Sequence, residues 1–499
     1  MKWFKQEQGV AFLAGASCVA GFAPFGIFPL PVLALAILFV LWLRADTPRA
    51  AAWLGFAFGL GLFSAGISWI YVALHDYGDM PALLALLGTL LFAAFLALLL
   101  ALAGYVQARI AAGYAVRAFL LMPAVWVLSE WIRGLIFTGF PWLTLGYAQS
   151  GSPLAGFAPL LGVYGVSLVA AVSAGLCAYA WQVHAGRRVL RVLLVLLAIW
   201  VAGYGMRYIQ WTEAQGEPLR VSLLQGNIPQ ELKFDPDQLI STLESYRHLV
   251  LQSDARLIVL PETALPLTLD ELPANYIAII RDHARSQAGD VLFGAFERDH
   301  GMVYNSVITL GSASSQSYRK NHLVPLGEFI PLRPALGWFI NDVLDIPMGD
   351  LARGGINQAP LSVAGQKVAA DICYEDAFGE EIIRQLPEAT LLVNFTNDAW
   401  YGNSFAAMQH NQMSQMRALE TGRMMLRATN TGVTSVIDRD GAILKMLPQH
   451  VEGVLDAEVQ GYTGSTPYVR FGNAPVVLLI VLMLAAAWRL GKRSYDLAE

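Results

Sequence analysis

Three residues in the C-terminal half of the chain have the types that covalent catalysis on an acyl group requires: Glu262, Lys320 and Cys373. Glu262 follows the apolar run at 256–261 and Cys373 follows the run at 366–372, so each is expected at the carboxyl end of a strand. A thiol becomes a strong nucleophile when a base removes its proton or a nearby cation lowers its pKa. A positive charge also stabilises the oxyanion of a tetrahedral intermediate. Glu262 is therefore a candidate base, Lys320 a candidate cation and Cys373 a candidate nucleophile.

Cys373 also has a structural interpretation, because free cysteine is among the most frequently buried residue types. The other two cysteines, Cys18 and Cys177, lie in long apolar runs, so Cys373 is the only cysteine outside them. An unpaired thiol in an oxidising compartment is a liability unless it is used. Spacing alone does not join Cys373 to Glu262 and Lys320, and both interpretations stay open on this evidence.

Histidines offer no alternative site. His283, His300, His322 and His410 are scattered without the spacing of metal ligands, and we interpret them as surface or structural residues. The sequence predicts no metal site and carries no sign of an organic cofactor.

The composition indicates what kind of protein must hold such a site. Apolar residues make up 56% of the 499 residues, charged residues make up 14%, and the mean hydropathy is +0.48. Soluble domains carry about 25% charged residues, so a disordered chain, a coiled coil and an ordinary cytosolic enzyme are excluded. A net charge of −5 argues against nucleic-acid binding, which usually needs a basic face. Three cysteines cannot build a disulfide framework.

The apolar residues concentrate in eight runs. Since a helix needs about 20 residues to cross ~30 Å of hydrocarbon, we predict about eight membrane spans, the first two of them short. The first run also fits a signal peptide, but no cleavage site precedes a soluble sequence. The runs are 9–24, 28–43, 52–74, 82–107, 118–137, 157–183, 189–209 and 474–490.

Charge divides the chain into a membrane region and a soluble-looking domain. Residues 1–210 together with 471–499 carry a net charge of +7, and residues 211–470 carry −12. Basic side chains fall in alternate loops, which the positive-inside rule places in the cytoplasm. The sequence therefore predicts seven spans in 1–210, an eighth span and a cytoplasmic tail in 471–499, and both termini in the cytoplasm. The domain at 211–470 then lies on the outer face, which is the periplasm in a bacterium.

The domain at 211–470 alternates short Val/Ile/Leu-rich strands with helical patterns. Continuous apolar runs are typical of strands that are covered on both faces, so we predict a layered α/β fold with a single core. The predicted strands are 219–226, 256–262, 290–296, 303–310, 366–373, 390–397 and 432–438, and the predicted helices are 236–253, 274–287, 376–386 and 404–421.

Sequence blocks around the candidate residues resemble those of a known family. "LPETALP", "YRKNHLVPLGEFIPL" and "DICYED" are similar to the signature blocks of the carbon–nitrogen hydrolase (nitrilase) superfamily, with its Glu–Lys–Cys triad. The spans before and after the domain, together with "LLQGNIPQELKF" and "NFTNDAWYG", resemble the apolipoprotein N-acyltransferases of that superfamily. The resemblance covers essentially the whole chain and implies a polytopic α-helical membrane bundle joined to an α-β-β-α sandwich.

The resemblance also implies roles for individual residues. It makes Glu262 the general base, Lys320 the oxyanion-stabilising lysine and Cys373 the nucleophile. With this match, a purely structural Cys373 is no longer expected. The residues that match the family's supporting positions, which orient the lysine or follow the nucleophile, are Glu328, Tyr374 and Glu375.

Aromatic residues near these blocks are the expected substrate-binding side chains. Phe234 stands where the family often has a tryptophan, so an aromatic wall is kept and an indole N–H is lost. Trp400 and Tyr401 stand where aromatic residues are expected near the site, but they fit the hydrophobic core equally well.

The reaction that the resemblance implies is acyl transfer at a bacterial inner membrane. The donor is a phospholipid, with phosphatidylethanolamine expected, and the acceptor is the α-amine of a diacylated apolipoprotein. A membrane-anchored amidase or nitrilase is the alternative enzyme. A transporter with an accessory domain is the alternative from another class, and Glu130 and Arg133 are its candidate intramembrane residues. The apolar segment at 334–342 is expected either to dip into the bilayer interface or to pack as a core or lid segment.

Overall fold

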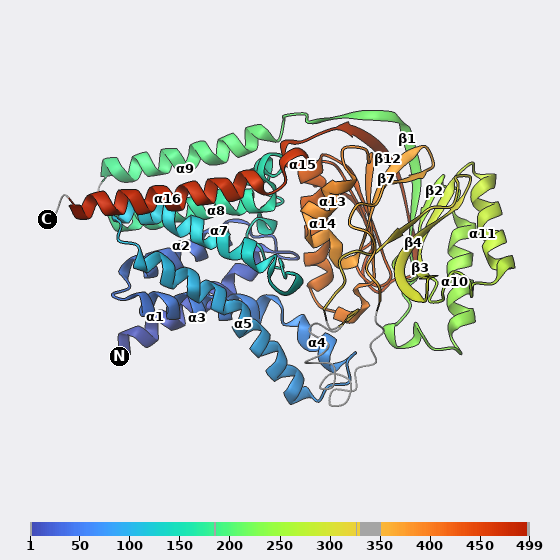
Figure 1. Cartoon of the computed structure of the whole chain (residues 1–499), viewed down its shortest axis with the longest axis horizontal. Coiled ribbons are helices and arrows are strands. Elements are labelled where there is room, and N and C mark those ends of the chain that lie inside the picture. Colours follow the sequence, from blue (N-terminus) through green and yellow to red (C-terminus); the bar gives the residue numbers. More distant parts are fainter. Residues whose placement is uncertain (1, 184–185, 326, 330–350, 497–499) are drawn as a thin grey trace. The chain divides into compact units, whose positions relative to one another are not determined.

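The computed structural model of the chain describes residues 2–183, 186–325, 327–329 and 351–496, so the apolar segment at 334–342 lies outside the described residues. The chain forms two compact units, whose elements are drawn in Figure 1. Residues 1–71, 81–210 and 470–499 make the first unit, and residues 72–80 and 211–469 make the second.

The first unit consists of apolar helices. Five helical segments of the described residues are long and apolar enough to cross a membrane, and a sixth span results if α3 and α4, bent by 58°, count as one. Each of the eight apolar runs contains a helix, but helix length and composition support six spans at most instead of eight. The helices are α1 (Lys2–Ser17), α2 (Pro29–Arg44), α3 (Pro48–Gly66), α4 (Trp69–His75), α5 (Ala82–Arg109), α7 (Met122–Arg133), α8 (Ala158–Val183), α9 (Gly186–Met206) and α16 (Ala474–Asp496).

Exposed apolar side chains on these helices fit a membrane environment. Leu193, Leu194 and Leu197 on α9 are all at least half exposed. A helix that is apolar on all sides is stable in a hydrocarbon surrounding. The chain is therefore a multi-pass membrane protein.

Glu130 and Arg133, the two residues considered for a transport path, have structural partners near the end of α7. Glu130 accepts a hydrogen bond from the backbone N–H of Leu145 at 2.8 Å. Arg133 donates to the backbone carbonyls of Phe140 at 2.6 Å and Trp142. Both side chains are buried, and an unpaired buried backbone group is costly. Their contacts with the non-helical segment after α7 therefore account for Glu130 and Arg133, which were the main candidates for a permeation path.

The second unit contains two six-stranded sheets. Their strand orders are β12-β1-β2-β3-β4-β5 and β11-β10-β9-β8-β7-β6. Strands β1, β2 and β3 pair in parallel, as do β7, β8 and β9, and the outer pairs are antiparallel. The strands are β1 (Thr212–Gln225), β2 (Leu257–Val259), β3 (Asp290–Asp299), β4 (Met302–Gly311), β5 (Ser317–Arg319), β6 (Leu361–Val363), β7 (Gln366–Ile372), β8 (Leu391–Thr396), β9 (Met425–Thr429), β10 (Ser435–Ile437), β11 (Ile443–Met446) and β12 (Gly453–Gly464).

Helices cover the outer face of each sheet, which gives the α-β-β-α order that the resemblance implied (Figure 1). On the first sheet these are α10 (Leu239–Gln252) and α11 (Ala274–Ser286), and on the second they are α13 (Gly379–Ile382) and α14 (Ala406–Thr421). Successive strand side chains point to opposite faces, so Leu223 lies in the core between the sheets and Leu224 packs against the helices. The predicted layered α/β fold is confirmed.

Two details of the predicted secondary structure are wrong. The helix expected at 376–386 is broken into η8 (Cys373–Ala377), α13 and η9 (Ile383–Gln385). The strands β5, β6, β9, β11 and β12 were not predicted. In β9 the buried Arg427 interrupts the apolar run that indicates a covered strand, and β12 has many polar residues because one edge of its sheet is open.

Candidate active site

The ends of three strands bring Glu262, Lys320 and Cys373 together. Glu262 lies shortly after β2, Lys320 directly follows β5, and Cys373 directly follows β7 in the facing sheet. The Nζ of Lys320 lies 3.3 Å from Oε1 of Glu262. Burial is the main cause that raises the pKa of the Cys373 thiol; the Glu262 carboxylate raises it further and the Lys320 ammonium lowers it. Both charged groups therefore influence the pKa of Cys373, whose sulfur is protonated before a substrate binds.

Lys320 is held between two carboxylates. Its side chain is 1% exposed, and Nζ donates to Oε1 of Glu328 at 2.9 Å in addition to Glu262. Burial alone would lower the pKa of Lys320, but Glu262 and Glu328 outweigh burial and raise it well above its ordinary value. Lys320 is thus a permanent cation in a water-poor site, where a charge acts more strongly than it does in solvent.

Asn305, in the middle of β4, bridges the same two carboxylates. Its Nδ2 donates to Oε1 of Glu262 at 2.7 Å and to Oε1 of Glu328 at 3.2 Å. Its backbone carbonyl accepts a hydrogen bond from the N–H of Lys320 at 2.8 Å. Sequence analysis missed this residue because a lone asparagine within a strand carries no pattern, and its carboxylate partners are 43 and 23 residues away.

Cys373 occupies the sharp turn where β7 ends and η8 begins. Its φ of +55° lies in the left-handed region, which costs a residue with a Cβ about 1–2 kcal/mol. A turn of this kind presents a nucleophile at the end of a strand, as the nucleophile elbow does in other layered α/β enzymes. The conformation must be stabilised by the surrounding contacts.

Glu375 connects the segments that carry the lysine and the cysteine. Its carboxylate accepts hydrogen bonds from the backbone N–H groups of Ile372 and Asn321, each at 2.7 Å. Burial raises the pKa of Glu375 to about 7, although these backbone hydrogen bonds lower it. Because Ile372 precedes Cys373 and Asn321 follows Lys320, this one side chain fixes the register between the two.

The predicted aromatic residues differ in exposure. Tyr374 is buried, whereas Phe234 is 55% exposed and Trp400 is 44% exposed. Trp400 therefore does not belong to the core, which was its alternative interpretation. Tyr401 is partly buried, and its pKa is raised by burial and then by Cys373.

Lys233 is a second buried lysine in the site, and sequence analysis did not identify it. It is 3% exposed, and its Nζ donates to the backbone carbonyl of Glu262 at 3.1 Å. Burial lowers the pKa of Lys233 to about 8, although Glu262 and Cys373 raise it. The only available signal was its position before Phe234, because a lone lysine is normally a solvated surface charge.

Two of the histidines, His410 and His322, lie near the site. His410, interpreted as surface or structural, is completely buried, and its Nε2 lies 3.2 Å from the carbonyl oxygen of Cys373. His322 stacks on Phe378 at 3.8 Å between ring centroids and pairs with Glu381 at 2.9 Å. Within the described ranges, no group of three or more His, Cys, Asp or Glu side chains is placed to hold a metal ion.

Comparisons with known proteins cover both units. Residues 220–468 match the carbon–nitrogen hydrolase family model, and residues 14–176 match the model of the apolipoprotein N-acyltransferase N-terminal domain. An apolipoprotein N-acyltransferase of Nitrosomonas europaea is 52% identical over 95% of this chain and 96% of that protein. One of Ralstonia nicotianae is 45% identical over 97% of this chain and 94% of that protein. A solved CN-hydrolase superfamily protein from Xanthomonas campestris is 20% identical, with a TM-score of 0.38, over 53% of this chain and 97% of that chain.

The second unit has two stacked sheets between helical layers, and its residues 220–468 match the hydrolase family model. The second unit is therefore a member of the carbon–nitrogen hydrolase class. The helical first unit carries the other family match, and the relatives align along nearly the whole chain. The chain belongs to the apolipoprotein N-acyltransferase family, whose members are enzymes of lipoprotein maturation.

Proposed function

We propose that this chain transfers a fatty acyl group from a phospholipid to the α-amine of a diacylated apolipoprotein through a thioester on Cys373. In the first half-reaction, Glu262 takes the proton of Sγ, and the thiolate attacks the ester carbonyl of the phospholipid. The carbon–oxygen bond then breaks, the departing lysophospholipid oxygen takes the proton from Glu262, and the acyl group remains on sulfur. A covalent intermediate of this kind predicts ping-pong kinetics.

In the second half-reaction, the amine of the S-diacylglyceryl-cysteine attacks the thioester carbonyl. Glu262 takes a proton from the attacking nitrogen, the carbon–sulfur bond breaks, and the proton returns to Cys373. In both halves Lys320 stabilises the oxyanion, while Glu328 and Asn305 hold the lysine and the base in place.

One observation carries this assignment of roles: the buried contact of Lys320 with two carboxylates beside a protonated thiol. Because burial keeps the pKa of Cys373 above its ordinary value, the sulfur needs a base during the step itself. Glu262 is the carboxylate whose charge acts most strongly on that sulfur. Lys320 then stabilises, with its positive charge, the oxyanion that forms on the carbonyl oxygen of the attacked acyl group.

The substrates follow from the family and from the exposed aromatic residues. We assign phosphatidylethanolamine as the acyl donor, and Phe234 and Trp400 as contacts for substrate chains, because both rings are open to a ligand. Tyr374 and Glu375 support the turn that carries Cys373. No metal or organic cofactor takes part in the proposed steps.

The proposed function can be tested with the full-length protein in detergent micelles, supplied with phosphatidylethanolamine and a synthetic diacylated lipopeptide. We expect one lysophospholipid for each triacylated lipopeptide, measured by mass spectrometry. The amidase alternative predicts instead the release of ammonia from a small amide without any need for phospholipid. Absence of both the lysophospholipid and the triacylated product would contradict the acyltransferase assignment.

The proposed location is the bacterial inner membrane. We divide the chain into membrane helices at 1–210, a periplasmic catalytic domain at 211–470, and a final helix with a cytoplasmic tail at 471–499. The basic loops on one side and the acidic domain on the other support this orientation.

Fusions of alkaline phosphatase should report this orientation directly, since that enzyme needs disulfides that form in the periplasm. A fusion after residue 211 is expected to be active in whole cells, and a fusion after residue 499 inactive. Immunoblots of both fusions control for expression. The opposite pattern would reverse the orientation.

A further inference from the structure

We propose that His410 is a positioning residue for Cys373: held as an imidazolium between two aspartates, it anchors the backbone carbonyl of the cysteine and so keeps the turn in which the thiol is presented. This inference rests on the proposed function, in which Cys373 is the nucleophile. It assigns a role to a buried group of charges that the two half-reactions do not use.

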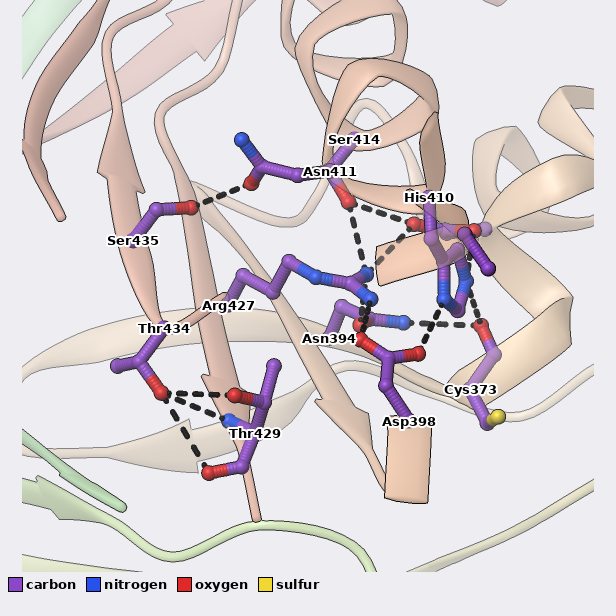
Figure 2. Close-up of polar contacts among 12 residues, drawn as sticks. Cys373, Asn394, Asp398, His410, Asn411, Ser414, Arg427, Thr429, Thr434 and Ser435 are labelled. Atoms are coloured by element: carbon purple, nitrogen blue, oxygen red, sulfur yellow. Dashed lines mark hydrogen bonds and ion pairs between the residues drawn. The ribbon is translucent and has the colours of Figure 1, made fainter. Parts of the chain in front are cut away.

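The carbonyl of Cys373 is anchored by two donors. Its oxygen accepts a hydrogen bond from Nδ2 of Asn394 at 3.1 Å and from Nε2 of His410 at 3.2 Å. Figure 2 shows this carbonyl pointing toward His410 and Asn394, while the sulfur points to the opposite side. The two donors therefore fix the peptide plane that follows the left-handed φ of +55°.

The contacts of the imidazole determine its charge. A carbonyl oxygen can only accept, so the Nε2 that faces Cys373 must carry a hydrogen. The Nδ1 lies 2.8 Å from Oδ1 of Asp398, and a carboxylate also only accepts. Burial would raise the pKa of Asp398, but Arg427 and His410 outweigh burial and lower it, so this carboxylate is ionised. With a hydrogen on both nitrogens, His410 is a cation.

Two aspartates pair with this cation, and Arg427 pairs with both aspartates; Figure 2 shows Asp398 between His410 and Arg427. Oδ1 of Asp376 lies 2.9 Å from Nε2 of His410, and Arg427 pairs with Asp376 at 3.1 Å and with Asp398 at 3.0 Å. Arg427 also donates to Oδ1 of Asn394 at 2.7 Å, which orients the amide toward Cys373. Two positive and two negative side chains, each at most 2% exposed, balance one another, and this balance offsets the cost of burying them.

The charges facing His410 also set the pH range in which it stays a cation. Burial and Arg427 on β9 lower its pKa, but Asp376 on η8 and Asp398 on η10 (Asp398–Tyr401) outweigh them and raise it to about 9. Asp371 on β7 borders the same cluster, and burial and Asp376 raise its pKa well above its ordinary value. His410 therefore keeps both hydrogens at neutral pH and loses one above about pH 9. It can then no longer donate hydrogen bonds to both the Cys373 carbonyl and Asp398.

Two variants of His410 separate positioning from simple packing. A glutamine amide reaches the place of Nε2 and can still donate to the Cys373 carbonyl, whereas an asparagine amide reaches only the place of Nδ1. We expect H410N to slow acylation of Cys373 by on the order of 10²-fold, as a nucleophile displaced by about 1 Å does, with an unchanged KM for phospholipid. We expect H410Q to recover most of that rate. The rate is measured by mass spectrometry of the full-length protein after mixing with phosphatidylethanolamine.

The pH profile gives a readout that packing alone would not change. The wild-type acylation rate should fall above about pH 9, and the H410Q rate should lack this additional fall, because an amide does not titrate. Ser435→Ala is the matched control: it removes a 2.6 Å hydrogen bond to Asn411, next to His410 on the same helix, and should leave the rate and the profile unchanged.

Three results would overturn the positioning role: a wild-type rate in H410N, equal losses in H410N and H410Q that follow equal losses of thermal stability, or the same alkaline fall in H410Q as in the wild type. Failure of the proposed function is distinguishable, because the wild-type protein would then form no adduct on Cys373 at all.

Discussion

Replacing Cys373 with alanine should abolish the acyl-enzyme and lower the transfer rate by on the order of 10⁴-fold or more, as removal of a nucleophile does in enzymes with a covalent intermediate. Glu262 and Lys320 would remain in place, but neither forms the thioester. Intact-protein mass spectrometry after incubation with phosphatidylethanolamine checks this. The wild-type protein should gain the mass of one acyl group, and C373A should gain none.

The fold of C373A should survive, because the substitution removes a single sulfur atom from a buried position, and a change of this size costs about 1 kcal/mol. Cys177→Ala is the matched control, since Cys177 lies on α8 in the first unit, and it should keep both the adduct and the activity. Acyl transfer by C373A to a diacylated lipopeptide at a rate near wild type would rule out the thioester.

Replacing Lys320 with methionine should cause the second largest loss. Removal of one oxyanion donor commonly costs 10²–10³-fold in rate, so we expect a fall of about 10³-fold in acylation of Cys373. The variant also leaves Glu262 and Glu328 without their shared cation. Loss of one partner of a buried ion pair costs about 3–5 kcal/mol, so a lower melting temperature should accompany the lower rate.

Single-turnover acylation and thermal unfolding in the same detergent measure the two effects of K320M separately. Lys367→Met on the exposed side of β7 is the control, and it should change neither quantity. Lys320→Arg should recover stability better than rate, since it restores a charge but not the position of a single ammonium between two carboxylates. A K320M protein that acylates Cys373 at the wild-type rate would show that the oxyanion is stabilised elsewhere.

The sequence by itself determined the division of the chain and the type of its second unit. Long apolar runs and the placement of basic residues are local signals, and so are the continuous Val/Ile/Leu strands, so they predicted a membrane region and a layered α/β domain. Because functional residues collect at the ends of strands, Glu262 and Cys373 stood out before their neighbours were known. The number of spans was less well determined, because the helices in the first two apolar runs, α1 and α2, have only 16 residues each, fewer than the ~20 that a span needs.

Only the tertiary structure decided how the site is held. Asn305 bridges Glu262 and Glu328, and His410 is 37 residues from the cysteine whose carbonyl it contacts. Such partners carry no periodic pattern, and their charge depends on burial and on neighbours from several strands and helices. The left-handed turn of Cys373 and the imidazolium of His410 therefore exist only because the folded chain surrounds them with groups that are distant in sequence.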